Sequence, residues 1–234
     1  MSTEILTPVG RLLQGSCFEP QTTDSENNPL IVKHGPNAGQ SRVDYFMSIA
    51  IPKTDPAYPE LWAKIHAAAV AGAPTLFGPD GACLNPAFAF KVTDGDSTVP
   101  NKKGVAPCTR ENFPGNWILN FSGGYAPKCY TLGGAEVITD PERIKRGYYI
   151  RIYGSVKGNG SMQQPGVYLN HSMVELVGFG EEIITGPAAD AVFGATPVGA
   201  MPAGASAIPV TPAVAIAAPV AAVQPAPSFL AGPK

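Results

Sequence analysis

The chain has 234 residues, of which only 15% are charged, and its formal net charge is −2. This length holds one large or two small domains, and the charge excludes a protein that attracts polyanions through an overall basic excess. The 26 glycines and 25 prolines favour short strands and many turns over long helices.

Positive charge is nevertheless concentrated in one segment. Between Asn101 and Lys157, nine lysines and arginines stand against four aspartates and glutamates, a local net charge of +5. A local basic patch can attract a polyanion even when the whole chain is slightly acidic. A solvated surface would carry the same residues, so charge alone leaves both interpretations open.

The cysteines and histidines show no spacing that is typical of a site. Cys17, Cys83, Cys108 and Cys129 form no Cys-x-x-Cys pair and have no histidine at ligand spacing, so we expect free thiols, no zinc and no other cofactor. The three histidines lie far apart and no nucleophile motif accompanies them, so we do not expect an enzyme. No signal peptide pattern occurs at the start, which with free thiols indicates a cytoplasmic protein.

The first half of the chain predicts two strands and a helix. A short apolar run predicts a strand at 10–17, and strict alternation predicts another from Val43 to Ile51 with its odd-numbered side chains buried. Asp55-Pro56 is typical of a helix start, and an apolar stripe that includes Trp62 follows it. We therefore expect a helix from Pro56 to Ala71.

The second half predicts four more strands. Alternation or an apolar run indicates strands at 88–93, 117–122, 147–157 and 166–177, the last two joined as a hairpin by turn-forming residues. Asp94 to Phe113 is a long polar loop, and loops of this length are often functional. Asp140-Pro141-Glu142 has the pattern of a capped turn.

These elements predict a mainly β domain at 1–186 and a tail. Residues 187–234 are dominated by alanine, proline, valine and glycine, which predicts a disordered Ala/Pro-rich tail whose prolines rule out a membrane span. Six or seven strands with one inserted helix fit a closed antiparallel barrel, of which the five-stranded Greek-key OB fold is the common form. A two-sheet sandwich is the structural alternative.

The strand at 147–157 carries the strongest functional signal. Its alternation places Ile150 and Ile152 on a buried face and lines up four polar or aromatic side chains on the other, namely Tyr149, Arg151, Tyr153 and Lys157. Rings interleaved with cations suit a polyanion that also carries flat bases. An ordinary solvent-facing strand could hold the same residues, and with the opposite parity Tyr148 would be the exposed ring.

Further candidates for nucleic-acid contacts lie outside this strand. They are Lys91, Tyr125, Lys128 and Tyr130, together with Lys102, Lys103 and Arg110 as mobile phosphate contacts. Tyr125 and Tyr130 could equally be half-buried loop anchors. Phe46 lies opposite the core parity of its strand, where it either faces a groove or covers the helix.

The order of these segments resembles a known family. Ser48 to Pro56 leads from strand into helix, Phe88-Ala-Phe-Lys-Val follows, and Gly147 to Lys157 precedes a block from Gly166 that ends Met-Val-Glu-Leu-Val-Gly-Phe-Gly-Glu-Glu at 173–182. This pattern resembles the bacteriophage single-stranded DNA-binding proteins with an OB fold, including those of T7-like phages. The likeness extends over roughly residues 43–182.

The resemblance implies an OB barrel with an inserted helix at 56–71. It also implies sequence-nonspecific coating of single-stranded DNA during phage replication or recombination, in the cytoplasm of the bacterial host, as a monomer or homodimer with phage or host replication proteins as partners. The T7-type proteins end in an acidic tail with a terminal aromatic residue. Here the last acids are Glu181, Glu182 and Asp190, and Phe229 is not terminal, so the functions of such a tail are not expected to carry over.

Two other functions compete with this interpretation. A β-rich domain with a low-charge Ala/Pro tail would also suit a phage structural or assembly protein, such as a capsid-decorating or tail component. An OB protein that binds RNA is a third hypothesis. An exposed aromatic and cationic face distinguishes the first hypothesis from the structural protein, and RNA and DNA oligomers of equal length distinguish it from the third.

Overall fold

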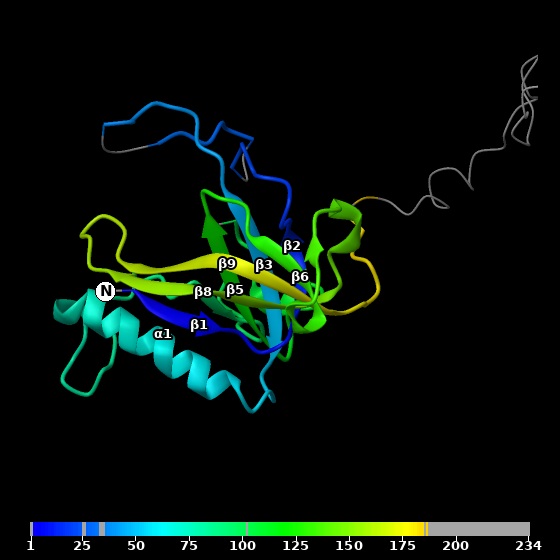
Figure 1. Cartoon of the computed structure of the whole chain (residues 1–234). Helices are drawn as coiled ribbons and strands as arrows, with labels where there is room; N and C mark the ends of the chain where they lie inside the picture. The colour runs from blue at the N-terminus through cyan, green and yellow to red at the C-terminus, as the bar shows by residue number, and fades with distance from the viewer. Residues whose placement is uncertain (1, 25–26, 33–35, 102, 185, 187–234) are drawn as a thin grey trace, which may run out of the picture. The chain divides into compact units, whose positions relative to one another are not determined.

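The computed structural model describes residues 2–24, 27–32, 36–101, 103–184 and 186 (Figure 1). In this part of the chain the fold is mainly β, with nine strands and one α-helix. The elements are β1 (Thr3–Leu6), β2 (Gly10–Gly15), β3 (Tyr45–Pro52), α1 (Tyr58–Gly72), β4 (Val92–Asp94), β5 (Asn116–Gly123), β6 (Lys128–Thr131), β7 (Val137–Ile138), β8 (Tyr149–Asn159) and β9 (Gly166–Gly178).

All nine strands belong to one sheet, in the order β4-β5-β3-β2-β8-β9-β6-β7, with β1 paired to β8 beside this path. The expected closed, five-stranded, purely antiparallel barrel is therefore wrong in three respects: the sheet has more strands, it is not closed by backbone pairing, and β6 runs parallel to β9. The extra strands are short segments that alternate too briefly to be recognised in the sequence. The two-sheet sandwich is not observed either.

The sheet nevertheless curls so that β5 and β9 come into contact at a seam. There, Nε2 of the buried His171 on β9 lies 2.7 Å from the carbonyl oxygen of Tyr45 on β3. Gly123 on β5 leaves room for the ring, since a Cβ at Gly123 would lie 3.1 Å from it. A side chain thus bridges the strands where a backbone ladder would otherwise close the barrel.

The concave side of the sheet holds the core. Met47, Ile49 and Ile51 of β3 are fully buried as predicted, but the intervening Ser48 and Ala50 are buried too, so burial does not alternate; β3 begins at Tyr45 and the preceding Val43 is exposed. Cross-strand partners Leu119 and Phe121 of β5 continue the same layer. A second, smaller cluster lies on the convex side, where Phe113 and its loop cover β2, β3 and β5.

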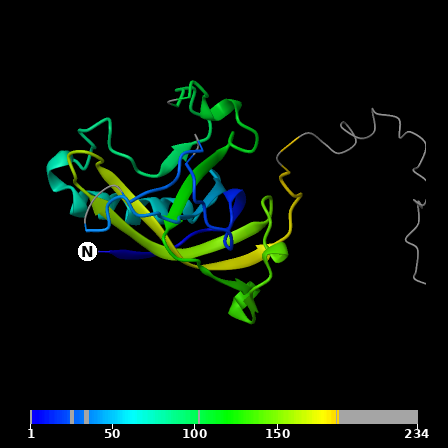
Figure 2. The ribbon, with the colours of Figure 1, turned by 90° about the horizontal axis from the view of Figure 1, so that it is seen from above.

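Helix α1 packs against the concave side, beside β8 and β1 (Figures 1 and 2). It begins at Tyr58, two residues later than predicted, because the Asp55 side chain accepts a hydrogen bond from the Ala57 N–H and forms a separate turn. Leu61 and Ile65 enter the core. The helix approaches β8 closely, since a Cβ at Gly158 would lie only 2.3 Å from the carbonyl oxygen of Ala68.

The strand predicted at 88–93 is mostly absent. Only Val92 and Thr93 belong to β4, whereas Phe88 and Phe90 pack in an aromatic cluster with Trp62 of the helix, with ring centroids of Trp62 and Phe90 5.2 Å apart. The chain changes direction at Lys91, whose φ of 60° lies in the left-handed region. Side-chain packing of the two phenylalanines therefore outweighs the strand pattern.

The structure does not describe the predicted C-terminal tail. The predicted tail at 187–234 lies outside the described residues, and the domain boundary at residue 186 remains a prediction. Within the part of the chain that is described, no helix is both long and apolar enough to cross a membrane.

Candidate nucleic-acid interface

The alternation predicted for β8 is confirmed. Ile150, Ile152 and Val156 are buried, whereas Tyr149 is 41% exposed and Lys157 is also exposed. Tyr148, the alternative exposed ring, instead packs against the core and makes an edge contact with Phe179, with ring centroids 5.2 Å apart. The side of β8 that carries Tyr149, Arg151 and Tyr153 therefore faces away from the core.

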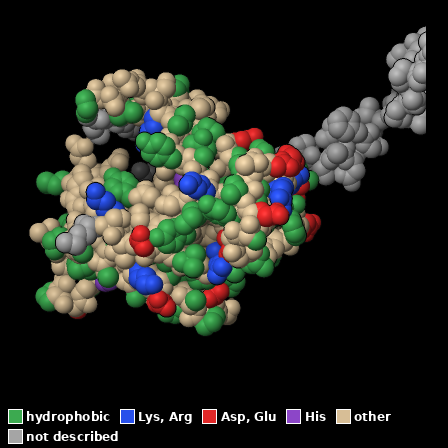
Figure 3. Space-filling view, in the orientation of Figure 1, with side chains coloured by type: hydrophobic (Ala, Val, Ile, Leu, Met, Phe, Trp, Pro, Cys, Tyr) green, Lys and Arg blue, Asp and Glu red, His purple; other side chains and the backbone are tan. Residues whose placement is uncertain are grey.

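Strand register gathers several predicted residues on this outer side. One row across β1, β8, β9 and β6 consists of Leu6, Tyr153, Met173 and Lys128, and the next row contains Arg151, Glu175 and Tyr130. We call the outer side of these four strands the flat face. Figure 3 shows hydrophobic side chains mingled with lysines and arginines over β8 and β9.

The two central predicted side chains of the flat face already have acidic partners. Nη2 and Nε of Arg151 lie 2.5 and 2.6 Å from Oε2 of Glu175, whose other oxygen accepts a hydrogen bond from the Gly133 N–H. A hydrogen bond to Glu4 raises the pKa of the Tyr153 hydroxyl. A phosphate would have to displace these carboxylates, because like charges repel.

A different arrangement occurs on the convex side of β2, β3 and β5. Two hollows adjoin there and a third lies beside them, between residues 87–91 and the β8–β9 turn at 163–168, and we call the three together the groove. The first, of about 560 Å³, lies beneath residues 20–24, which we call the arm, and is also lined by Gln14 and Phe46. Gln14 also lines the second, with Ser48, Asn120 and Arg110. The third, of about 430 Å³, is lined by Lys91 and Tyr168, and the Asn120 N–H donates to the Lys91 carbonyl oxygen at 2.9 Å.

The groove contains cations without acidic partners. The Arg110 guanidinium lies 4.0 Å from the centre of the Phe113 ring, and neither it nor Lys91 has a carboxylate within 4 Å among the described residues. Asp24 is the one carboxylate that lines any of the three hollows in the described chain. The left-handed backbone of Lys91 costs about 1 kcal/mol or more, and such strain is concentrated at functional sites.

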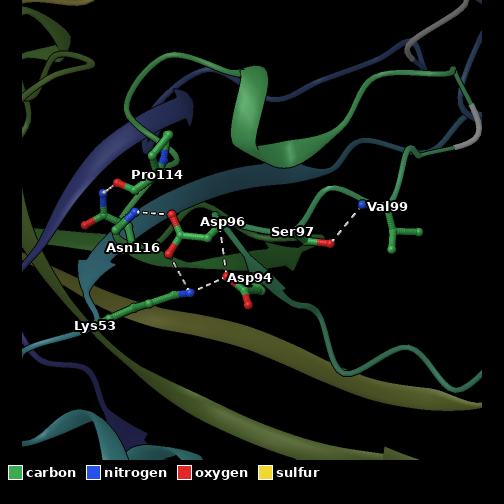
Figure 4. Close-up of polar contacts among 8 residues, drawn as sticks. Lys53, Asp94, Asp96, Ser97, Val99, Pro114 and Asn116 are labelled. Atoms are coloured by element: carbon green, nitrogen blue, oxygen red, sulfur yellow. Dashed lines mark hydrogen bonds and ion pairs between the residues drawn. The ribbon is translucent and has the colours of Figure 1, made fainter.

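The long loop that forms one wall of the groove is anchored at its base by an ion-pair cluster (Figure 4). The Lys53 ammonium contacts Asp94 and lies 2.7 Å from Asp96, and it is 4.7 Å from the centre of the Trp117 ring. Asp96 also accepts a hydrogen bond from the Gly115 N–H at 2.8 Å, which closes the loop. The hydrogen bonds from Lys53 lower the pKa of both carboxyls.

The remaining predicted residues are dispersed. Tyr125 is 88% exposed in the turn between β5 and β6, Lys103 lies in an exposed turn of the long loop, and Lys102 lies outside the described residues. Tyr149 lines a separate pocket with Arg11, whose guanidinium donates to the carbonyl oxygens of Gly147 and Glu181 and to the Asn112 side chain. The structure therefore divides the predicted site between the flat face and the groove.

Sequence reasoning missed the polar lining of the groove. Gln14 and Asn120 face outward between apolar residues that enter the core, and Ser48, which pairs with both, is buried between them. The sequence did contain a signal for this lining, because polar side chains that alternate with buried apolar ones along a strand indicate a polar outer surface. Phe46, for which a groove position was one of two alternatives, lines the hollow beneath the arm.

The described residues hold no group of three or more His, Cys, Asp or Glu side chains that could bind a metal ion. Cys17, Cys83, Cys108 and Cys129 are free thiols. The groove offers amides, hydroxyls, aromatic rings and cations, with the Asp24 carboxylate at one end.

Comparison with known proteins identifies the fold. No protein-family model matches the chain, and neither does any curated protein sequence. Among solved structures, the chain has the fold of a bacteriophage single-stranded DNA-binding protein. That protein, from bacteriophage Enc34, matches with a TM-score of 0.52 and 14% sequence identity over 80% of this chain and 88% of its own.

Further solved structures match as well. The Enc34 protein in complex with single-stranded DNA gives a TM-score of 0.52 at 14% identity, covering 77% of this chain and 89% of that one. A weaker match, with a TM-score of 0.46 at 14% identity over 81% and 92% of the two chains, is gp2.5, a single-stranded DNA-binding protein encoded by bacteriophage T7. The resemblance that the sequence indicated is confirmed at the level of the fold.

Proposed function

We propose that this protein binds single-stranded DNA without sequence specificity, in the groove over β2, β3 and β5. The observation that carries the proposal is the shared fold with the Enc34 protein, whose structure has been solved in complex with single-stranded DNA. The matched proteins are described as DNA-binding proteins rather than enzymes, and we propose no catalytic step.

The chemistry of the groove supports this choice of surface. Phe46 and Tyr168 offer rings for base stacking, which is worth roughly 1–3 kcal/mol per base and tolerates any sequence. Lys91 and Arg110 are free of carboxylate partners in the described chain, so a phosphate would release counterions there without breaking an ion pair. The side-chain amides of Gln14 and Asn120 can hydrogen-bond to base edges or sugars.

We further infer an OB-type barrel that is completed at the β5–β9 seam by side chains, and a role in coating single-stranded DNA during phage replication or recombination. In that setting the protein works in the cytoplasm of the bacterial host, and its partners are replication proteins. The stacking roles predicted for Tyr149 and Tyr153 on the flat face remain predictions, and variants at these positions distinguish the two surfaces.

The direct test is fluorescence anisotropy of the full chain with a labelled oligo-dT of about 30 nucleotides, long enough to span several sites of the size that OB folds use. A duplex of the same length serves as the control, and each titration is made at two salt concentrations. We expect tight binding to the single strand that weakens with salt, and much weaker binding to the duplex. Absence of binding at low salt would contradict the proposal and favour the phage structural protein.

A further inference from the structure

The chain is held in place where it leaves the sheet after β9. Residues 179–184, which we call the strap, run beside the segment that precedes β8. The Ile183 N–H donates to the carbonyl oxygen of Arg146 at 2.9 Å, and the Glu182 carboxylate lies 3.4 Å from Nζ of Lys145. These contacts fix the strap, which has no regular secondary structure of its own.

The side chain of Ile183 joins the strap to the groove. It packs against the small buried cluster on the convex side, which contains Phe113 and Ile118. The same two residues line the second hollow of the groove. By contrast, the neighbouring Ile184 is 75% exposed and packs against neither cluster of the described chain. One side chain of the strap therefore supports buried residues that line the groove.

A second link between the strap and the groove passes through Arg11 on β2. Its guanidinium donates to the carbonyl oxygen of Glu181 in the strap at 2.9 Å and to Oδ1 of Asn112 at 2.7 Å. Asn112 immediately precedes Phe113 in the long loop. The strap is thus tied to this point of the loop by a hydrogen-bonded side chain as well as by apolar contact.

Phe113 in turn holds a cation of the groove. The Arg110 guanidinium lies 4.0 Å from the centre of the Phe113 ring, and the Phe113 N–H donates to the Arg110 carbonyl oxygen at 3.2 Å. The face of an aromatic ring attracts a cation and orients it. Since the guanidinium has no ion pair among the described residues, its position depends on where this ring lies.

We propose that Ile183 is a positioning residue for DNA binding: it keeps Phe113, and through it the Arg110 guanidinium, in place to meet a phosphate in the groove. A cation that is already oriented loses less conformational freedom when it binds. The inference rests on the proposed function and deepens it, because it assigns part of the DNA affinity to the strap, which lines none of the three hollows.

The first test compares variants of two adjacent residues by anisotropy of the full chain with oligo-dT at several salt concentrations. Ile183→Ala should bind roughly three- to tenfold more weakly at low salt, with a salt slope lower by up to about one, because the contact of Arg110 with a phosphate is weakened. Ile184→Ala removes the same atoms from an exposed side chain and should bind as the wild-type chain does. Ile183→Val should retain most of the affinity.

The Arg110→Ala background shows whether Ile183 acts through Arg110. There, Ile183→Ala should cause no further loss of affinity, since coupled residues are not additive. Arg11→Met cuts the link to Asn112 and should also weaken binding, and it carries the test if Ile183→Ala does not fold. A loss of stability alone would leave the salt slope of the folded molecules unchanged.

A spectroscopic measurement follows the position of Arg110 without DNA. A proton above a ring face resonates upfield, so in the NMR spectrum the Arg110 Nε–H signal should move downfield in Ile183→Ala and stay in place in Ile184→Ala. A wild-type chain that fails to bind oligo-dT while this signal moves would reject the proposed function and support the positioning role. The positioning role is overturned if the signal does not move, if the two isoleucine variants bind alike, or if Ile183→Ala further weakens Arg110→Ala.

Discussion

The groove and the flat face are two outer surfaces of the same sheet, and both carry aromatic and basic side chains. They differ in what those side chains already contact. In the groove, Arg110 and Lys91 have no carboxylate partner in the described chain, whereas on the flat face Arg151 pairs with Glu175 and the nearby Glu4 raises the pKa of Tyr153. Identical residue types therefore have different capacities to bind a phosphate, because a paired cation must first give up its partner.

The two surfaces also differ in how far neighbouring segments enclose them. The groove is bordered by the arm at 20–24 and by the long loop that Lys53 anchors, so a bound strand would lose water on several sides. The flat face has no such walls over its central row. A concave, partly enclosed surface suits a ligand better than an open one does.

The largest expected effect comes from removing the cations of the groove. Lys91→Ala combined with Arg110→Ala should weaken binding to oligo-dT by roughly 10- to 100-fold at low salt and reduce the salt slope by between one and two, because two phosphate contacts are lost. Anisotropy titrations at several salt concentrations measure both quantities.

The matched control is Lys128→Ala combined with Arg151→Met, which removes the same two positive charges from the flat face. We expect less than about a threefold change in affinity for the control, since nonspecific attraction alone is altered. Equal losses in the two double variants would remove the distinction between the surfaces, and a larger loss in the control would assign DNA to the flat face.

The next largest effect is expected at the β5–β9 seam, where His171 contacts Tyr45 of β3. His171→Ala leaves the Tyr45 carbonyl oxygen without its partner and should lower the free energy of unfolding by about 1–2 kcal/mol. Urea denaturation measures this loss. His171→Gln retains an N–H donor and should lose less; an alanine variant as stable as the wild type would show that the seam contributes nothing to closure.

A smaller effect is expected from the ion pair of the flat face. Arg151→Met should lower the free energy of unfolding by about 1 kcal/mol, because the pair is partly exposed, and should leave oligo-dT affinity unchanged. Thermal denaturation of this variant measures the change in stability, and anisotropy measures its affinity for oligo-dT. A loss of DNA affinity without a loss of stability would contradict the structural role assigned to Arg151.

The smallest effect concerns the loop anchor. Lys53 holds the pKa of Asp94 and Asp96 below their ordinary value of 3.8. Carboxyls with a lowered folded-state pKa stabilise the fold above their ordinary pKa, and this contribution is lost as the pH falls through the lowered pKa. We therefore expect the emission of Trp117, which lies beneath Lys53, to change in acid. Lys53→Met should abolish this change in emission. A change that persists in the variant would show that it arises from another group.

Alternation in the sequence determined which side of each long strand is buried. Met47, Ile49 and Ile51 on β3, and Ile150 and Ile152 on β8, were assigned correctly because side chains alternate along a strand, whereas the burial of Ser48 and Ala50 on the other side of β3 comes from the loop that carries Phe113. The same rule correctly placed Tyr149, Arg151 and Tyr153 outside, and the hairpin of β8 and β9 was predicted from the turn residues between them.

Only the tertiary structure decided what these outward residues meet. Glu175 lies 24 residues from Arg151 and reaches it through strand register, and Glu4 meets Tyr153 through a strand too short to be recognised. The parallel β6, the seam at His171 and the groove walls likewise join segments distant in sequence. Periodicity is a local property and specifies the buried face, whereas the pairing of charges and the enclosure of a surface depend on contacts between distant segments.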